Sequence, residues 1–401
     1  MEIKPLSDVA SIDISGVDKK TKEKEYSIKL CNFTDVYYNW AVSLDNLNSF
    51  MNATANKTEI ERFSLKKGSV AITKDSETRD DIGIPCYIAD DFSNTLLGYH
   101  CALIKPQKGV LDGRYLNAYL NTKMARKYFS NQVSGSGQRY TLTIGGIGAV
   151  QIPIIELENQ IRIGKFFSII DKKISINKKI NAELESIAKT IYDYWFLQFE
   201  FPNEKGKPYK SSGGQMVWNE ELKRDIPEGW THTTLSAISN MYQPKTFSAK
   251  LIDDNGKYRV YGAGGYMGQY SDFNHEHAEI FISCRGSCGD IYKSMPFSLI
   301  TGNSMIVHPN NDDLFEYLYL TLERIGVKNC ITGSVQPQIT RDSLNGWRLV
   351  LPTEQIINHF ATITKSIFIR QEKVIEENQE LISLRDFLLP LLMNGQVKFK
   401  E

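Results

Sequence analysis

Apolar residues recur at intervals of three and four positions along two long stretches of the chain, which predicts two long amphipathic helices. The stretches cover residues 156–197 and 354–393. Each exceeds the average globular helix severalfold, so its apolar stripe must be covered by another element. The stripe positions are Ile163, Phe166 or Phe167, Ile170, Ile174, Leu184, Ile187, Ile191 and Trp195, then Ile356, Phe360, Ile363, Ile367, Val374, Leu381, Leu384 and Leu388.

Polar residues interrupt both stripes near the middle. They are Asn177 and Asn181 in the first stretch, and Arg370 and Glu377 in the second. Interruptions in matching places favour two helices that pair in opposite directions, so we expect an antiparallel coiled coil. The alternative is that both are ordinary core helices. Proline and glycine after the last apolar positions, at 390 and 395, are expected to end the second helix.

A region that mixes short apolar runs with turns precedes each long helix. These regions, 1–155 and 231–353, have the pattern of globular domains with strands and short helices. Between them, residues 198–230 are rich in Pro, Gly, Ser and charge and predict an exposed connector, and 394–401 form a tail. The expected strands are 69–73, 99–104, 278–283 and 304–308, and the expected short helices are 111–129 and 314–324.

The two halves of the chain repeat one another. A Gly-Ser turn that ends in glutamine occurs at 135–138 and again at 333–336, and each is followed by a proline and a long helix. The interval from Phe166 to Phe360 equals that from Ile187 to Leu381. Duplication of this kind predicts that the single chain folds into two similar halves related by an approximate two-fold axis. The expected fold class is α+β, with two globular α/β domains, each followed by a long helix, in pseudo-two-fold symmetry.

Charge and cysteine content narrow the function classes. Lys plus Arg and Asp plus Glu both number 47, so the net charge is zero, which argues against binding nucleic acid alone through a broad basic face. It is compatible with local basic patches, or with a recognition subunit whose partners supply phosphate contacts. The six cysteines form no CxxC pair, so neither a zinc ribbon nor a disulfide framework is suggested.

Signals for membranes and secretion are absent from the sequence. No run of eighteen apolar residues occurs, and the N-terminus lacks the apolar core of a signal peptide. We therefore expect a cytoplasmic protein that does not bind membranes.

Catalytic motifs are also missing. There is no Walker loop, no dinucleotide-binding glycine pattern after a strand, no HExxH and no Pro-Pro-aromatic motif of adenine methyltransferases. We expect a protein that is not an enzyme, with no catalytic residue, bound metal or cofactor of its own.

Turns carry the remaining candidate chemistry. Arg and Gln read guanine and adenine edges, Ser and Lys hold phosphates, and glycine allows close approach of a backbone. Any one of these residues is more simply an ordinary loop residue, but their matched placement in two repeats favours DNA binding. The candidates are Lys74, Ser76, Arg79, Gln138, Arg139 and Tyr140 in the first region, and Tyr261, Gly264, Tyr266, Arg285, Ser287, Asn303, Ser334, Gln336 and Gln338 in the second.

Several segments with recognisable sequences occur in a fixed order along the chain. They are SVAITKDSE at 69–77, IFISCRGSCG at 280–289, GSVQPQI at 333–339, PTEQ at 352–355, the connector at 201–214 with IPEGW at 226–230, and LLPLLMNG at 388–395. Taken together, they resemble the specificity subunits of Type I restriction-modification systems. The likeness covers essentially the whole chain. The first copy departs from the pattern, with Gln138-Arg139-Tyr140 where the second has Gln336-Pro337-Gln338.

The resemblance implies two target recognition domains, each reading one half of a bipartite, asymmetric site in double-stranded DNA. The paired helices would fix the gap and dock two methyltransferase subunits, which bind S-adenosylmethionine and modify adenine. Restriction and translocase subunits can join them. Two alternatives remain at this point: a coiled-coil scaffold that binds protein, and a recognition subunit of another multi-subunit modification or defence system.

Overall fold

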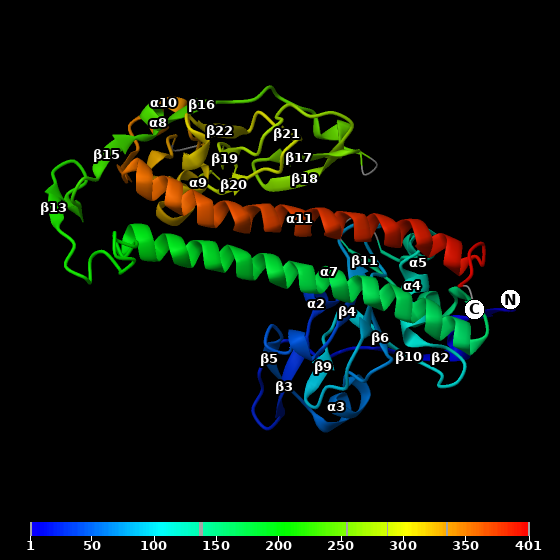
Figure 1. Ribbon diagram of the computed structural model, residues 1–401. Coiled ribbons are helices and arrows are strands. Elements are labelled where there is room, and N and C mark those ends of the chain that lie inside the picture. The colour runs from blue at the N-terminus through cyan, green and yellow to red at the C-terminus, as the bar shows by residue number, and fades with distance from the viewer. Residues whose placement is uncertain (1, 136–138, 254–255, 287, 334–335, 400–401) are drawn as a thin grey trace. The chain divides into compact units, whose positions relative to one another are not determined.

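The computed structural model describes residues 2–135, 139–253, 256–286, 288–333 and 336–399 (Figure 1). The chain forms two compact units. Unit 1 comprises Met1–Asn177 and Glu377–Glu401, and unit 2 comprises Lys178–Glu376. Each unit therefore contains one globular region and one part of each long helix. Within the described residues, no helix is long and apolar enough to cross a bilayer.

A five-stranded sheet forms the centre of unit 1, in the order β2-β10-β6-β8-β4. Its middle strands are buried along their whole length, which suits their β-branched and apolar residues. The strands are β2 (Ala10–Ile14), β10 (Cys101–Pro106), β6 (Val70–Thr73), β8 (Pro85–Ile88) and β4 (Ala41–Val42); all neighbours are antiparallel except β4 and β8.

Smaller sheets and short helices surround this centre. The sheets are β5 (Met51–Ala55), β3 (Tyr26–Cys31) and β9 (Thr95–Leu97); β1 (Glu2–Pro5) with β12 (Gln151–Ile154); and β7 (Asp75–Ser76) with β11 (Tyr140–Thr141). The helices are α1 (Leu6–Val9), α2 (Phe33–Tyr37), η1 (Leu44–Asn46), α3 (Lys57–Phe63), α4 (Gly113–Leu120), α5 (Lys123–Gln132) and α6 (Ile144–Gly148).

The single helix expected at 111–129 is wrong, because the chain forms α4 and α5 with a break between them. Thr122 has extended backbone angles, and its hydroxyl accepts a hydrogen bond from the Ala125 N–H. A threonine in this position caps a new helix. Periodicity continues across such a break, so the apolar pattern alone did not reveal it.

A four-stranded antiparallel sheet forms the centre of unit 2, in the order β16-β22-β19-β20. The strands are β16 (Ser239–Tyr242), β22 (Ser304–Pro309), β19 (Ile280–Ser283) and β20 (Ile291–Lys293). A second sheet contains β18 (Gly265–Tyr270), β17 (Tyr258–Gly262) and β21 (Ser298–Ile300), and β15 (Thr231–Thr234) pairs with β23 (Arg348–Leu351). The short helices are α8 (Leu235–Ile238), η3 (Ala249–Leu251), η4 (Asp312–Leu314), α9 (Phe315–Ile325), η5 (Lys328–Cys330) and α10 (Arg341–Asn345).

Strand predictions in both regions are confirmed with small shifts. Strands β6, β10, β19 and β22 lie where the sequence predicts them, and α9 matches the expected helix at 314–324. Strand β10 begins later than expected because His100 has a φ of +74°, a left-handed conformation that a strand cannot contain.

The connector is largely exposed, as expected, but it is not a loop throughout. It contains the hairpin of β13 (Met216–Asn219) and β14 (Arg224–Pro227). The Phe201 ring stacks on Trp230, with centroids 4.8 Å apart, and on Tyr209 at 4.6 Å. Phe201 and Trp230 belong to the main core of the unit. The Pro, Gly, Ser and charged residues predicted the exposed part of the connector, but not the packing of these aromatic residues.

The two predicted long helices are present as α7 (Leu157–Tyr192), which continues into the π-helix η2 (Asp193–Leu197), and α11 (Glu354–Met393). Their buried faces differ in part from the predicted stripes, since Ile187 and Leu384 are 47% and 45% exposed. Ala188 and Gln371 are buried instead. The spacing of apolar residues cannot choose between adjacent positions when a small or polar residue fills one of them.

Proline does not end the second helix. Pro390 lies within α11, and its carbonyl accepts the Asn394 N–H at 3.0 Å, so the helical hydrogen bonds continue after it. The end comes at Gly395, whose φ is +69°. The Gln396 N–H then donates to the Leu391 carbonyl at 2.9 Å, a bond typical of a glycine-terminated helix.

Within each unit, the portions of α7 and α11 contact one another through polar as well as apolar groups. In unit 1, the Asn177 amide donates to Glu377 Oε2 at 2.8 Å and to Asn378 Oδ1 at 2.9 Å, although Asn177 is only 1% exposed. In unit 2, Gln371 Nε2 donates to the Asn181 carbonyl at 3.3 Å. Three of the four predicted polar positions, Asn177, Asn181 and Glu377, take part in these bonds. Among the described residues, the side-chain oxygens of Asn177 and Asn181 are buried and accept no hydrogen bond.

A lysine links the sheet of unit 2 to this polar contact. Lys293 Nζ, on β20, donates to Gln371 Oε1 at 2.9 Å and lies 3.4 Å from the centroid of the Phe368 ring. Burial lowers the pKa of Lys293 to about 8. The strand, α11 and α7 are thereby joined through two side chains.

We expect Lys293→Met to change how stability depends on pH. A lysine pKa that is lower in the folded state costs stability below pH 8, and this cost disappears as the pH rises from about 8 towards 10.5. Relative to the variant, the wild type should gain roughly 2 kcal/mol of unfolding free energy between pH 7 and pH 10. Urea unfolding across this range measures the difference. Lys205→Met, in the connector, is the control, and parallel pH curves for wild type and Lys293→Met would contradict the assignment.

Candidate nucleic-acid interface

The predicted turn of the first domain is tied to the end of strand β6 by backbone hydrogen bonds. The Lys74 N–H donates to the His100 carbonyl at 2.8 Å, and the Lys74 carbonyl accepts the Leu142 N–H at 2.7 Å. Ser134 and Thr141 exchange two further backbone bonds and so close the turn. Gly135 has a φ of +116°, and a Cβ there would lie 2.2 Å from the Arg139 carbonyl oxygen, so only glycine fits.

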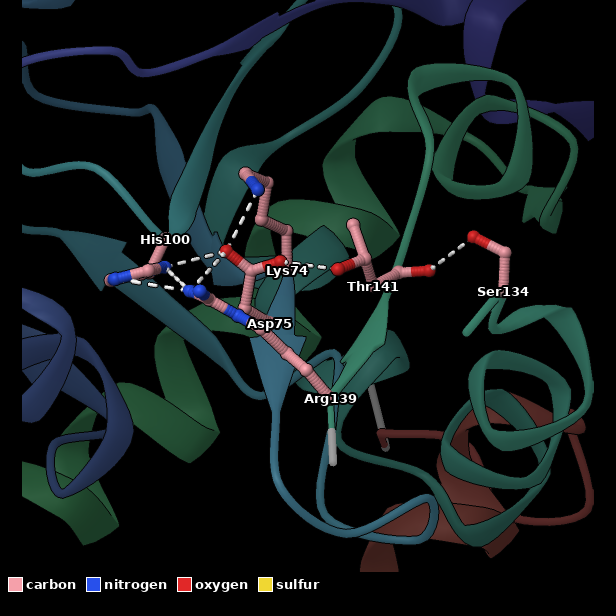
Figure 2. Close-up of polar contacts among 6 residues, drawn as sticks. All are labelled: Lys74, Asp75, His100, Ser134, Arg139 and Thr141. Carbon is pink, nitrogen blue, oxygen red and sulfur yellow. Dashed lines mark hydrogen bonds and ion pairs between the residues drawn. The ribbon is translucent and has the colours of Figure 1, made fainter. Parts of the chain in front are cut away.

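A buried carboxylate organises the side chains at this place (Figure 2). Asp75, with a side chain 8% exposed, accepts hydrogen bonds from Lys74 Nζ at 2.8 Å, His100 Nδ1 at 2.6 Å and Thr141 Oγ1 at 2.7 Å. Burial raises the pKa of Asp75, but these three bonds outweigh it and bring the pKa to about 2. The group is therefore an anion that holds its donors in place.

Arg139 is the outward-facing member of this cluster. Its guanidinium lies against the His100 ring and 3.3 Å from Asp75 Oδ2, while its side chain is 55% exposed. Lys74, in contrast, is 16% exposed, and its charge is directed at Asp75. The cluster contains two cations, Lys74 and Arg139, and one anion, Asp75. Its net charge is therefore positive, and a ligand meets this charge at the exposed Arg139 guanidinium.

Ser76 and Tyr140 lie beside the cluster, on the paired strands that contain Asp75 and Thr141. Ser76 is on β7, paired with Tyr140 on β11, and its hydroxyl accepts the Thr78 N–H. Arg79 is exposed, and its Nε donates to the Ser130 carbonyl at 2.9 Å. Gln138 lies outside the described residues. The structure thus brings together Lys74, Ser76, Arg139 and Tyr140.

The second domain repeats the backbone arrangement with other side chains. The Cys284 N–H donates to the Asn303 carbonyl, and the Cys284 carbonyl accepts the Ile339 N–H, as Lys74 does in the first domain. Thr332 and Gln338 exchange the two bonds that close the turn, after Gly333 with a φ of +87°. Arg285 forms an isolated β-bridge with Gln338. Arg285 therefore occupies the position of Asp75, and the charge at this point is reversed.

A cavity of about 460 Å³ opens at this place in unit 2. Two predicted residues, Arg285 and Gln338, line it, and both are exposed. Tyr242, Gln243 and Arg341 line it as well, and the sequence analysis missed them. The arrangement places two guanidinium groups and two amides around one opening, which suits hydrogen bonding to base edges or phosphate.

The remaining candidates of the second domain divide by exposure. Tyr261 is buried in the core, 7% exposed, and its hydroxyl accepts the Met295 N–H, so it is not available to a ligand. Tyr266 is 49% exposed, with the Arg259 guanidinium 4.8 Å from its ring centroid. Gly264, Asn303 and Gln336 are exposed. Ser287 and Ser334 lie outside the described residues.

Two residues of the first cluster carried no sequence signal. His100 reaches Asp75 from the position directly before β10, and its left-handed conformation is not predictable from its type. Asp75 has no donor to offer DNA, so a search for groups that bind bases or phosphates passed over it. The role of Asp75 follows only from the side chains that donate hydrogen bonds to it.

The family of the chain follows from comparison with known proteins. The model of the Type I restriction modification DNA specificity domain matches residues 1–186 and 227–383. The chain belongs to this family. The two matched segments contain the two domains that carry the repeated turn, and the resemblance inferred from the sequence is confirmed.

Relatives of this specificity-domain protein match over almost their full length. It is 25% identical to the Type I restriction enzyme MjaIX specificity subunit of Methanocaldococcus jannaschii, covering 100% of this chain and 94% of the relative. It is 22% identical to the HindI specificity subunit of Haemophilus influenzae, covering 83% and 87%. A crystal structure of a Type I S subunit from M. genitalium shares the fold, with a TM-score of 0.59, 16% identity and coverage of 98% and 95%.

We expect Asp75→Asn to loosen the turn of the first domain. Removal of a buried charge that three donors share should lower the unfolding free energy by roughly 2–4 kcal/mol at pH 7. Since the pKa of Asp75 is depressed, its contribution is present above about pH 4 and is lost as the pH falls towards 2. The difference between wild type and variant should therefore shrink over this interval. Denaturant unfolding measures it, with exposed Glu77→Gln as the control; a constant difference would contradict the role.

Proposed function

We propose that this chain is the non-catalytic DNA-recognition subunit of a Type I restriction-modification complex. Each domain reads one half of a bipartite, asymmetric site in double-stranded DNA. The observation that carries the proposal is the repeated turn: the same backbone hydrogen bonds hold His100, Asp75 and Thr141 in one domain, and Asn303, Arg285 and Gln338 in the other. The two domains share these backbone hydrogen bonds but display different side chains, which suits the recognition of two different half-sites.

The chemistry of each turn supports contact with DNA. In the second domain, Arg285 and Gln338 can pair with guanine and adenine edges in the major groove. In the first, Arg139 is the exposed group aimed by the Asp75 cluster. We assign phosphate contacts to Ser76, Arg79, Ser287, Asn303 and Ser334, and base or sugar contacts to Gln138, Arg139, Tyr140, Tyr266, Arg285, Gln336 and Gln338, with Gly264 allowing close approach. Lys74 supports Arg139 indirectly, because its charge is directed at Asp75.

The long helices act in this proposal as a spacer. We infer that α7 and α11 pair along their length as an antiparallel coiled coil and relate the two domains by pseudo-two-fold symmetry. The contacts of Asn177 with Asn378, and of Gln371 with Asn181, support this inference within each unit. A buried polar pair in an apolar seam selects one register, and a fixed register gives a fixed gap between half-sites.

Partners supply what the chain lacks. We propose that the helices dock two methyltransferase subunits, which bind S-adenosylmethionine and modify adenine, and that restriction and translocase subunits join this assembly in the cytoplasm. The chain itself would hold no cofactor. Its zero net charge is consistent with subunits that close on the DNA together.

Methylation by the assembled complex tests the proposal. Mapping of methylated adenines should return two short specific sequences separated by a fixed gap. Replacement of residues 231–353 by the corresponding region of another family member should change one half-site and leave the other, and the gap, intact. A complex that methylates without sequence preference, or whose DNA binding is insensitive to salt, would overturn the proposal and favour a protein-binding scaffold.

Two matched arginine variants test the assignment of each domain to its half-site. We expect Arg139→Ala to relax specificity in one half-site and Arg285→Ala in the other, each with a loss of roughly 10- to 100-fold in affinity. Each variant serves as the control for the other. Competition binding with duplexes mutated in one half at a time measures the effect. Equal losses across both halves would assign the arginines to phosphate rather than bases.

A further inference from the structure

Each domain has a loop that leaves its central sheet beside the repeated turn. In unit 1 the loop covers residues 15–25 and joins β2 to β3; in unit 2 its described part covers residues 243–253 and 256–257, between β16 and β17. Strands β2 and β16 pair with β10 and β22, which directly follow His100 and Asn303. Strands β3 and β17 each have one antiparallel and one parallel neighbour. The two loops therefore occupy the same place in the repeat.

A backbone hydrogen bond holds the first loop beside the side-chain cluster of Figure 2. The Tyr99 N–H donates to the Val17 carbonyl at 2.8 Å. Tyr99 directly precedes His100, a member of that cluster. Lys19 and Lys20 follow Val17 by two and three positions, so their Cα atoms lie at most about 7 and 11 Å from that of Val17. Both lysines are therefore close to the repeated turn of the first domain.

A glycine brings the second loop equally close to its turn. A Cβ on Gly302 would lie 2.8 Å from the Pro244 carbonyl oxygen and 3.2 Å from the Thr246 backbone nitrogen, so the absence of a side chain permits this approach. Gly302 directly precedes Asn303, whose carbonyl accepts one of the repeated backbone bonds. Lys245 lies between the two contact residues, with its Cα about 3.8 Å from each of theirs.

The ammonium groups of these lysines are not used within the protein. Lys19, Lys20 and Lys245 are exposed, and in the described parts of the chain none of the three forms a salt bridge. The carboxylate nearest to the first pair, Asp18, lies 3.4 Å from Lys22 Nζ and pairs with that residue instead. Each loop thus displays positive charge next to the repeated turn.

We propose that Lys19, Lys20 and Lys245 bind phosphates of the DNA backbone beside each half-site. The major groove is about 12 Å wide, so a group that reads bases in it has phosphates on either side, at distances that a lysine next to the turn can span. An ammonium group is a compact charge on a flexible stem, and it contacts phosphate without reading bases. This inference rests on the proposed function and identifies groups that hold the duplex independently of its sequence.

The salt dependence of DNA binding by the assembled complex tests the proposal. Each phosphate contact adds about 0.9 to the slope of log affinity against log salt concentration. Lys19→Gln combined with Lys20→Gln should therefore lower this slope by roughly 2, and Lys245→Gln by roughly 1. Between 50 and 200 mM salt, the wild type should lose about 12-fold more affinity than the double variant and about 3.5-fold more than Lys245→Gln. The mapped methylation site should not change, because phosphates carry no sequence information.

Lys66→Gln combined with Lys67→Gln is the matched control. Both residues are exposed lysines of the first domain, but they precede β6, whereas the cluster follows the other end of that strand. The slope of this variant should equal that of the wild type. An equal fall in the control and in the Lys19 and Lys20 variant would reduce the effect to overall charge and overturn the local assignment.

Neutral backbone links identify the phosphates that the lysines contact. Single methylphosphonate links are placed in turn along both strands of each half-site and its flanks. In the wild type, the links that replace contacted phosphates should weaken binding, and this penalty should be absent from the lysine variant of the same domain. Equal penalties at every link in wild type and variants would overturn the proposal.

The outcomes separate this inference from the function on which it rests. Unchanged slopes in both lysine variants, together with a mapped bipartite site, overturn the role of the loops and leave the proposed function standing. A wild-type complex that binds and methylates without sequence preference overturns the proposed function, whatever the lysine variants do.

Discussion

The backbone groups of one residue after the central strand impose the main constraint on both domains. Lys74 in the first domain and Cys284 in the second each have an N–H and a carbonyl that leave the sheet and need partners. In both domains the N–H donates to the backbone carbonyl of the residue before the neighbouring strand. The carbonyl accepts the backbone N–H of a residue that follows the glycine turn. Buried backbone groups tolerate few alternatives. The same backbone hydrogen bonds therefore occur in both domains, while the side chains at these positions differ.

Electrostatics at the two turns illustrate this freedom. Asp75 and Arg285 occupy matching positions but carry opposite charges, so the first domain must gather cations around its carboxylate whereas the second displays its cation directly. The exposed arginine comes from the turn in one case and from the strand end in the other. A zero net charge over the chain thus coexists with a guanidinium group displayed at each turn.

Much of the architecture was predictable, because periodicity and turn chemistry are local. The long helices, the buried strands and the glycine turns follow from spacing and residue type. The packing of Phe201 on Trp230 and the buried Gln371 were not predictable, since each depends on a partner distant in sequence. The break at Thr122 is local, but the apolar periodicity continues across it and conceals it. The same holds at the candidate site. Arginine and glutamine could be chosen by type, whereas Asp75 and His100 matter through their hydrogen bonds.

The last segment of the chain completes the core that the first segment begins. Leu389, Leu392 and Met393 pack in the same cluster as Leu6, Val70 and Phe167. On the ribosome, a domain at the start of a chain usually finishes folding first. Here that order is inverted: the whole of unit 2 emerges before unit 1 receives its final apolar residues. Until residues 389–393 have been synthesised, the nascent first domain lacks the apolar side chains that complete its core.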